Sequence, residues 1–341
     1  MNLAERLWSR VLETRARRYA AGTLPSERLD RPVVSVGNLT VGGTGKTPVV
    51  EHLARWLAAA GLRPAVLSRG YGRRSRETVV VSSGDGPLVA PDRGGDEPVL
   101  LARRLPGVIV AVAPRRRDAA RAALAHAPDV FILDDGFQHL SVRRDVDLLL
   151  LDAVEPFGGL RYPPFGRLRE PLSAMGRADA FVFTRPHPGF PDEAALAAVA
   201  LENPEAPAFA AEIRAAGLEA ASGAAAGLAA DARCVAVAGV ARPATFAAAL
   251  ARIGIAPAET LLFPDHHRYT PSDAARIAEA ARRSESAAVV TTGKDAVKLE
   301  PLLSLPVRTI RLEVELPAAL LDFVHRGLFP ETPAAGRGGV S

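Results

Sequence analysis

The feature that most constrains this chain is an apolar run that passes through a glycine-rich loop directly into a helical pattern. Residues 32–38 read PVVSVGN, the loop reads LTVGGTGKT, and residues 48–61 read PVVEHLARWLAAAG. Glycines in such a loop let backbone N–H groups turn inward around an anion, and the helix N-terminus adds partial positive charge. A strand, a glycine-rich loop and a helix in this order are what a phosphate-binding loop (P-loop) requires. The sequence therefore predicts an α/β core that binds a nucleotide.

Specific roles follow for the loop residues. Lys46 is expected to reach the β- and γ-phosphates, and the Thr47 hydroxyl to bind Mg²⁺. The strict pattern G-x-x-x-x-G-K-[ST] has glycine where this chain has Thr40, so we expect Gly42 and Gly43 to supply the flexibility. An ordinary glycine-rich turn is the alternative, which the flanking strand and helix disfavour. The predicted nucleotide-binding residues are Gly42, Gly43, Thr44, Gly45, Lys46 and Thr47.

Short apolar runs alternate with helical patterns along most of the chain. PVVSVGN, RPAVLSRG, GVIVAVAP, DVFILDD, VDLLLLDA and AFVFTR are nearly continuous, as strands buried on both faces are. Helical segments around 48–60, 96–104 and 115–126 separate several of them. This rhythm predicts a P-loop NTPase-like, doubly wound and mostly parallel sheet.

The same rhythm resumes after a stretch near 203–230 that is rich in Ala, Gly and Pro. That stretch is expected to contain the crossing to a second, smaller α/β lobe. We therefore predict an N-terminal amphipathic helix over 1–22, a P-loop kinase core over 23–205, the second lobe over 206–328 and a flexible tail over 329–341.

Two acidic residues end one of the predicted buried strands. DVFILDDGFQH places Asp134 and Asp135 there, and ligands of parallel sheets bind at the carboxyl ends of strands. A carboxylate beside a P-loop is the usual partner of Mg²⁺. Adjacent side chains on a strand point to opposite faces, so we expect one of the pair to face the metal, without distinguishing which.

The basic residues are distributed unevenly between the two types. Of 42 Lys and Arg, only three are Lys: Lys46, Lys294 and Lys298. A lysine kept against such a bias is expected to be one that arginine cannot replace. The net charge of +4 suits an anionic substrate or a membrane surface and is too small and scattered to indicate nucleic-acid binding. The single cysteine excludes an internal disulfide framework.

Residues 2–20 read as a helix with Leu3, Leu7, Trp8, Val11 and Leu12 on one face and arginines over much of the rest. A basic amphipathic helix that carries Trp can lie in a membrane interface. The alternative is a helix that packs its apolar face on the sheet. The sequence contains no run of about 18 uninterrupted apolar residues that would predict a membrane-spanning helix.

Candidates for acid–base and anion-binding roles lie outside the P-loop. Asp96, in RGGDEP, is a candidate for the base that takes a proton from a hydroxyl, although a helix N-cap is the better interpretation from sequence alone. Arginine suits phosphate oxygens, and Tyr71 could pack on a sugar. We expect Glu170 to hold Arg169 in place. The candidate substrate-binding residues are Arg69, Tyr71, Arg116 and Arg169.

The motifs VGNLTVGGTGKTP, SRGYGR, GGDEP, LDDGFQH, LREP, FPDHHRY and TTGKDAVK, in this order, resemble the tetraacyldisaccharide 4′-kinase family, the lipid A 4′-kinases of Gram-negative bacteria. The resemblance extends from the first helix to about residue 325. Gly293 stands where the family pattern often has Glu.

The resemblance implies transfer of the γ-phosphate of ATP, with Mg²⁺, to the 4′-hydroxyl of a lipid A disaccharide precursor. It implies a peripheral protein on the cytoplasmic face of the inner membrane, attached through residues 2–20. It also implies Asp96 as the base, with a histidine of FPDHHRY as its partner; we favour His266 over His267. The expected catalytic residues are Asp96, His266 and Lys46, in a monomer. The alternatives are a P-loop NTPase that acts as a switch or metallochaperone, and a soluble sugar kinase.

Overall fold

The computed structural model describes residues 2–184, 193–229 and 232–330. Most of the tail that the sequence predicts over 329–341 lies outside these residues. The chain forms two compact units, and both are discontinuous in sequence. The first unit takes the described residues of Met1–Leu67, Ala127–Ile213 and Val314–Ser341, and the second takes Ser68–His126 and Arg214–Glu313. The linear division expected from the sequence stays a prediction.

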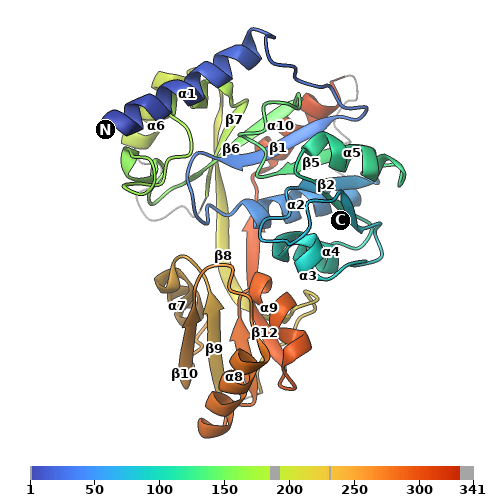
Figure 1. Cartoon of the computed structure of the whole chain (residues 1–341), viewed down its shortest axis with the longest axis vertical. Helices are drawn as coiled ribbons and strands as arrows, with labels where there is room; N and C mark the ends of the chain where they lie inside the picture. The colour runs from blue at the N-terminus through green and yellow to red at the C-terminus, as the bar shows by residue number, and fades with distance from the viewer. Residues whose placement is uncertain (1, 185–192, 230–231, 331–341) are drawn as a thin grey trace, which may run out of the picture. The chain divides into compact units, whose positions relative to one another are not determined.

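A parallel sheet forms the centre of the first unit (Figure 1). Its strands follow the order β8-β7-β6-β1-β5-β2, and the neighbouring strands pair in parallel. The inner strands are buried along their whole length, which explains their nearly continuous apolar sequences. The predicted α/β class with a mostly parallel sheet is confirmed. The strands are β1 (Val33–Asn38), β2 (Pro64–Ser68), β5 (Val130–Asp134), β6 (Val146–Asp152), β7 (Ala180–Thr184) and β8 (Ala208–Ala220).

Helices cover this sheet. The helix that follows the P-loop buries Val49, Val50, Leu53 and Leu57. The last helix packs on β1 and β6 so closely that a Cβ at Gly327 would lie 2.3 Å from the Val146 side chain. None of the described helices is both long enough and apolar enough to span a bilayer. The helices of this unit are α1 (Leu3–Ala20), α2 (Lys46–Ala59), α6 (Glu193–Glu202) and α10 (Ala318–Leu328), with short 3-10 turns at Gly158–Leu160 and Leu172–Arg177.

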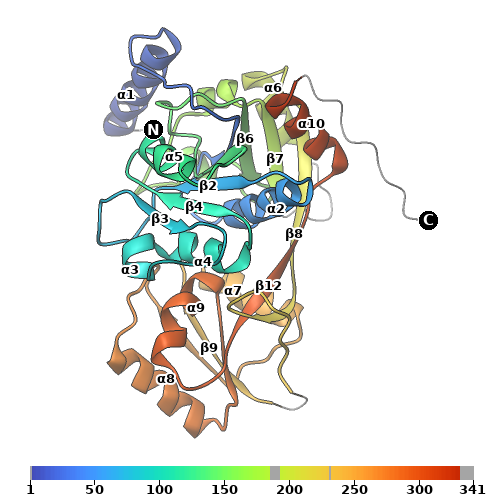
Figure 2. The same cartoon turned by 90° about the vertical axis from the view of Figure 1, so that its right-hand side faces the viewer.

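The second unit contains four parallel strands in the order β10-β9-β11-β12. It also contains an antiparallel pair, β3 with β4 (Figure 2). One face of β9 packs on α8 through Val235 and Val237, and the other packs on α7 through Cys234 and Ala236. The strands are β3 (Val79–Ser82), β4 (Ile109–Val112), β9 (Cys234–Gly239), β10 (Glu259–Phe263), β11 (Ala288–Thr291) and β12 (Val307–Glu315). The helices are α3 (Pro91–Gly94), α4 (Asp96–Arg104), α5 (Arg116–Leu124), α7 (Pro243–Arg252), α8 (Pro271–Arg283) and α9 (Gly293–Leu299), with a 3-10 turn at Glu300–Leu302.

The Ala- and Gly-rich stretch near 203–230 contains the longest strand of the described chain. β8 has 13 residues, and β8 and β12 each have residues in both units. The sequence analysis predicts only a crossing here.

Candidate active site

The P-loop joins β1 to α2 in the first unit, as predicted. Gly42 and Gly45 adopt φ values of 115° and 80°, the left-handed region that side chains disfavour. A Cβ at Gly45 would also lie 2.4 Å from the Ile213 side chain, so a glycine is required there. The first turn of α2 has no side-chain cap, which leaves its N–H groups available to a bound anion. Thr184, at the end of β7, donates a 2.9 Å hydrogen bond to the Thr44 carbonyl and so fixes the loop to this strand.

Lys46 is oriented by Asn38, which the sequence does not single out. Its Nζ donates to Asn38 Oδ1 at 3.1 Å and lies 3.4 Å from Asp135 Oδ1. Asn38 ends β1, is fully buried, and donates through Nδ2 to the Thr40 carbonyl at 2.7 Å. One amide thus fixes both the entry of the loop and the lysine at its far end.

The two aspartates at the end of β5 have different surroundings. Asp134 is the last residue of β5 and is 2% exposed. Asp135 follows with a φ of 53°, and its carboxylate accepts hydrogen bonds of 2.6 and 2.8 Å from the two terminal nitrogens of Arg169. Burial by itself would lower the pKa of the Arg169 guanidinium. The hydrogen bonds to Asp135 more than offset this effect, so the pKa is raised. Glu170 forms its own ion pair with Arg177 at 2.6 Å, and its charge also helps to raise the pKa of Arg169, as expected of a residue that holds this arginine.

A second cluster lies in the second unit, around Asp96. Asp96 is the first residue of α4, but Gly95 occupies the N-cap position and no side chain caps this helix. Asp96 Oδ2 instead lies 3.6 Å from His266 Nδ1 and 3.0 Å from Lys298 Nζ. Burial opposes the ionised form, but the contacts with His266 and then Lys298 lower the pKa of Asp96. The carboxylate is therefore ionised at neutral pH, as a base must be.

The structure separates the two histidines of FPDHHRY. His266 adopts a φ of 55° and its ring centroid lies 4.7 Å from that of Tyr71. His267 turns away: Nε2 lies 3.1 Å from Asp273, and its ring stacks on Phe263. The geometry favours His266 as the partner of Asp96.

The residues proposed for substrate binding have different environments. Tyr71 is 69% exposed and Arg69 is also exposed, so both are accessible on the second unit. Arg116, at the start of α5, is only 2% exposed, so its guanidinium lies inside that unit. Arg169 lies in the first unit, bound to Asp135 as described. Their roles stay predictions.

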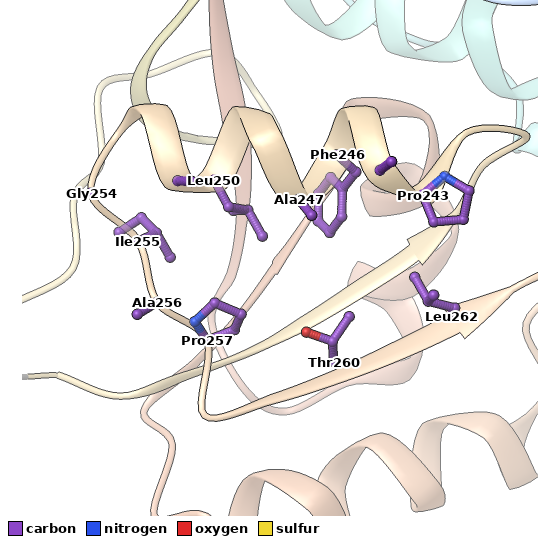
Figure 3. A pocket seen from close by; sticks show the side chains of 12 residues that line it. Pro243, Phe246, Ala247, Leu250, Gly254, Ile255, Ala256, Pro257, Thr260 and Leu262 are labelled. Carbon is purple, nitrogen blue, oxygen red and sulfur yellow. The ribbon is translucent and has the colours of Figure 1, made fainter.

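A separate pocket of about 660 Å³ lies between α7 and β10 (Figure 3). Phe246, Leu250, Ile255 and Leu262 line it together with other apolar or small residues, and no charged side chain does. It has none of the groups that phosphoryl transfer requires and is not the candidate site.

The chain is similar to known proteins over nearly its whole length. The family model described as "Tetraacyldisaccharide-1-P 4'-kinase" matches residues 1–328. A tetraacyldisaccharide 4′-kinase of Anaeromyxobacter dehalogenans strain 2CP-C is 42% identical over 331 residues, covering 92% of this chain and 85% of that protein. One of Geobacter sulfurreducens is 43% identical over 324 residues, covering 90% and 86%. The solved structure of LpxK from Aquifex aeolicus in complex with ATP has a TM-score of 0.78 and 32% identity, covering 95% of this chain and 97% of that one.

Proposed function

The chain belongs to the tetraacyldisaccharide-1-P 4′-kinase family, and on this premise we propose how its own residues perform the reaction. The protein is an ATP-dependent kinase of lipid A biosynthesis that phosphorylates the 4′-hydroxyl of a tetraacyldisaccharide 1-phosphate. The family match does not favour the switch, the metallochaperone or the soluble sugar kinase. The observation that carries the mechanism is Asp96, an ionised carboxylate beside His266, in a chain that also has a P-loop.

The first unit holds ATP in this proposal. Backbone N–H groups of residues 42–47 surround the phosphates, and Lys46 neutralises charge on the oxygens of the transferred group. Asn38 and Asp135 hold the Lys46 ammonium at the loop before ATP arrives, so little reorganisation is needed on binding.

The residues at the end of β5 fit a magnesium ion. Mg²⁺ prefers hard oxygen ligands, which the Thr47 hydroxyl and a strand-end carboxylate provide. Asp135 already pairs with Arg169 and lies near Lys46, so we assign to it the orientation of these two side chains. We assign the binding of Mg²⁺ to Thr47 and Asp134. Bound there, Mg²⁺ would neutralise phosphate charge.

The second unit supplies the base. Asp96 takes the proton of the 4′-hydroxyl as this oxygen attacks phosphorus, and His266 stabilises the carboxylate on the side away from the acceptor. Tyr71, exposed and against the His266 ring, offers a flat surface for the sugar. Arg69 and Arg116 of this unit, and Arg169 of the first, are proposed to bind anionic groups of substrate or nucleotide.

The first helix is proposed to hold the protein on the cytoplasmic face of the inner membrane. Its inward residues are Glu5 and Ser9, whereas Leu3, Leu7, Trp8 and Val11 are 53–75% exposed. The exposure of these four side chains argues against packing of that apolar face on the protein, although Leu12 of the same face packs on the core. An apolar, Trp-containing face flanked by arginines suits an interfacial helix. We also propose a monomer.

The test is transfer of radiolabel from [γ-³²P]ATP to purified tetraacyldisaccharide 1-phosphate, with product mapping at the 4′-position. ATP hydrolysis without a labelled lipid would favour a switch or metallochaperone instead. Equal transfer to a water-soluble sugar would favour a soluble sugar kinase.

A further inference from the structure

Two lysines on α9, Lys294 and Lys298, each pair with a carboxylate. The imidazole of His266 lies close to both of these carboxylates. The lysines stand four residues apart, so they lie on one side of the helix. Lys298 Nζ is 3.0 Å from Asp96 Oδ2, and Lys294 Nζ is 2.5 Å from Asp265 Oδ1. His266 lies next to both, with Nδ1 3.6 Å from Asp96 and Nε2 4.0 Å from Asp265. The helix packs directly on α4, which carries Asp96 (Figure 2).

Three oxygen atoms lie close to Lys298 Nζ. Besides Asp96 Oδ2, its Nζ lies 3.2 Å from Asp295 Oδ1 and 3.0 Å from the His267 carbonyl. Asp295 is fully buried and is fixed in turn by the Gly239 N–H and the Thr292 hydroxyl. An ammonium has three N–H donors on one centre and matches three converging acceptors, whereas a planar guanidinium does not. This explains why Lys298 is one of only three lysines among 42 basic residues.

The contacts on Asp96 are asymmetric. The closest approaches of the Lys298 ammonium and the His266 imidazole to Asp96 are both to Oδ2. Asp96 is 9% exposed, so a carboxylate there has few ways to orient itself through water. The oxygen that remains for an acceptor hydroxyl is Oδ1.

We propose that Lys298 is a positioning residue for phosphoryl transfer: it fixes the Asp96 carboxylate by Oδ2 and thereby presents Oδ1 to the acceptor hydroxyl. The proposal rests on the role of Asp96 as the base. Lys298 also helps to keep that carboxylate ionised, together with His266, which faces it from the loop between β10 and α8. Lys294 fixes Asp265 on the other side of the imidazole.

The experiment compares Lys298→Met, Lys298→Arg, Asp96→Asn and the double variant Lys298→Met with Asp96→Asn. Lys298→Met is expected to lower kcat by roughly 10- to 100-fold with an unchanged KM for ATP, and to move the acid limb of the pH profile up by roughly one unit, because an opposing charge is lost. Lys298→Arg is expected to retain the acid limb, since the charge remains, but to lower kcat by roughly tenfold. In the Asp96→Asn background, Lys298→Met should add no further loss.

The matched control is Arg103→Met. It breaks the 2.6 Å ion pair of Arg103 with Glu300, which links α4 to the turn after α9 without contact to Asp96. This variant should keep both kcat and the pH profile. A wild-type kcat in Lys298→Arg, or additive losses in the double variant, would overturn the role of Lys298. If Lys298→Met is unfolded, the kcat of Lys298→Arg tests the proposal by itself. Retained turnover in Asp96→Asn would instead reject Asp96 as the base, a separate outcome.

Discussion

Arg169 donates hydrogen bonds of 2.6 and 2.8 Å from its two terminal nitrogens to the Asp135 carboxylate. We therefore expect Asp134 to bind Mg²⁺ and the neighbouring Asp135 to orient Arg169 and Lys46. Asp134→Asn is expected to raise the Mg²⁺ concentration required for half-maximal activity by roughly tenfold or more, because a charged ligand is lost. Asp135→Asn is expected to lower kcat with a much smaller change in Mg²⁺ dependence, since it releases Lys46 and Arg169.

The measurement is initial rate against free Mg²⁺ at saturating ATP, with each variant serving as the control of the other. An Mg²⁺ requirement raised in Asp135→Asn and unchanged in Asp134→Asn would reverse the assignment.

Lys46→Ala is expected to lower kcat by a factor of roughly 10² to 10³ or more, because a preorganised cation at the transferred phosphate is removed. Lys46→Arg keeps the charge but not the fit between Asn38 and Asp135, so it should recover only a small part of the rate. Radiolabel transfer to the lipid acceptor measures both variants. Normal turnover in Lys46→Ala would remove the P-loop from the mechanism.

Asp96→Asn is expected to lower kcat by roughly 10² to 10⁴ while ATP binding is retained, since the change removes the base but not the nucleotide site. Asp92→Asn, an exposed residue on the adjacent helix α3, is the control and should behave as wild type. Turnover and nucleotide binding are measured on the same preparations. Loss of ATP binding in Asp96→Asn would mean that this carboxylate does not act as proposed.

Polar substitution of the outward face of α1, with Leu7, Trp8 and Val11 all changed to Ser, is expected to weaken binding to vesicles of anionic phospholipid at least tenfold. These side chains are exposed, so the melting temperature should change little. Leu88→Ser, which alters an exposed leucine of the second unit, should leave vesicle binding unchanged. Sedimentation with vesicles gives the result, and unchanged binding of the triple variant would exclude α1 as the membrane anchor.

The ion pair between Glu5 and Arg161 predicts a pH-dependent contribution to stability. The hydrogen bond from Arg161 lowers the pKa of Glu5 from 4.5 to about 2. A lowered folded-state pKa stabilises the fold above the unfolded value, and this contribution disappears as pH falls from about 4.5 to about 2. Glu5→Gln should therefore lower the melting temperature at pH 6, with a difference that shrinks below pH 4.5. A difference that is constant between pH 6 and pH 3 would contradict this.

Buried parallel strands were the most predictable part of the fold, because their apolar runs report burial on both faces. β8 was not predictable in this way. Its sequence, AFAAEIRAAGLEA, is rich in residues that strands disfavour, and most of it is exposed or half-buried. Its pairing with β7, with Phe181 opposite Ala208, determines the strand where local propensity does not.

The P-loop was predictable because its function lies in backbone geometry, which glycine spacing encodes locally. Asn38 reaches Lys46 across the loop, only eight residues along the chain. Lys298 instead reaches Asp96 from about two hundred residues away in sequence. No local pattern encodes a contact between segments so far apart. The scarcity of lysine was the one signal in the sequence that pointed to Lys298.

The position of α10 on β1 and β6 has a consequence for biosynthesis. β1 leads into the P-loop and leaves the ribosome well before the helix that packs on it, Ala318–Leu328. A nascent or truncated chain that lacks this helix exposes the apolar surface around Val146 that Gly327 would cover. The nucleotide-binding unit therefore completes its fold only after Ala318–Leu328 has been synthesised, and until then this apolar surface is available for aggregation.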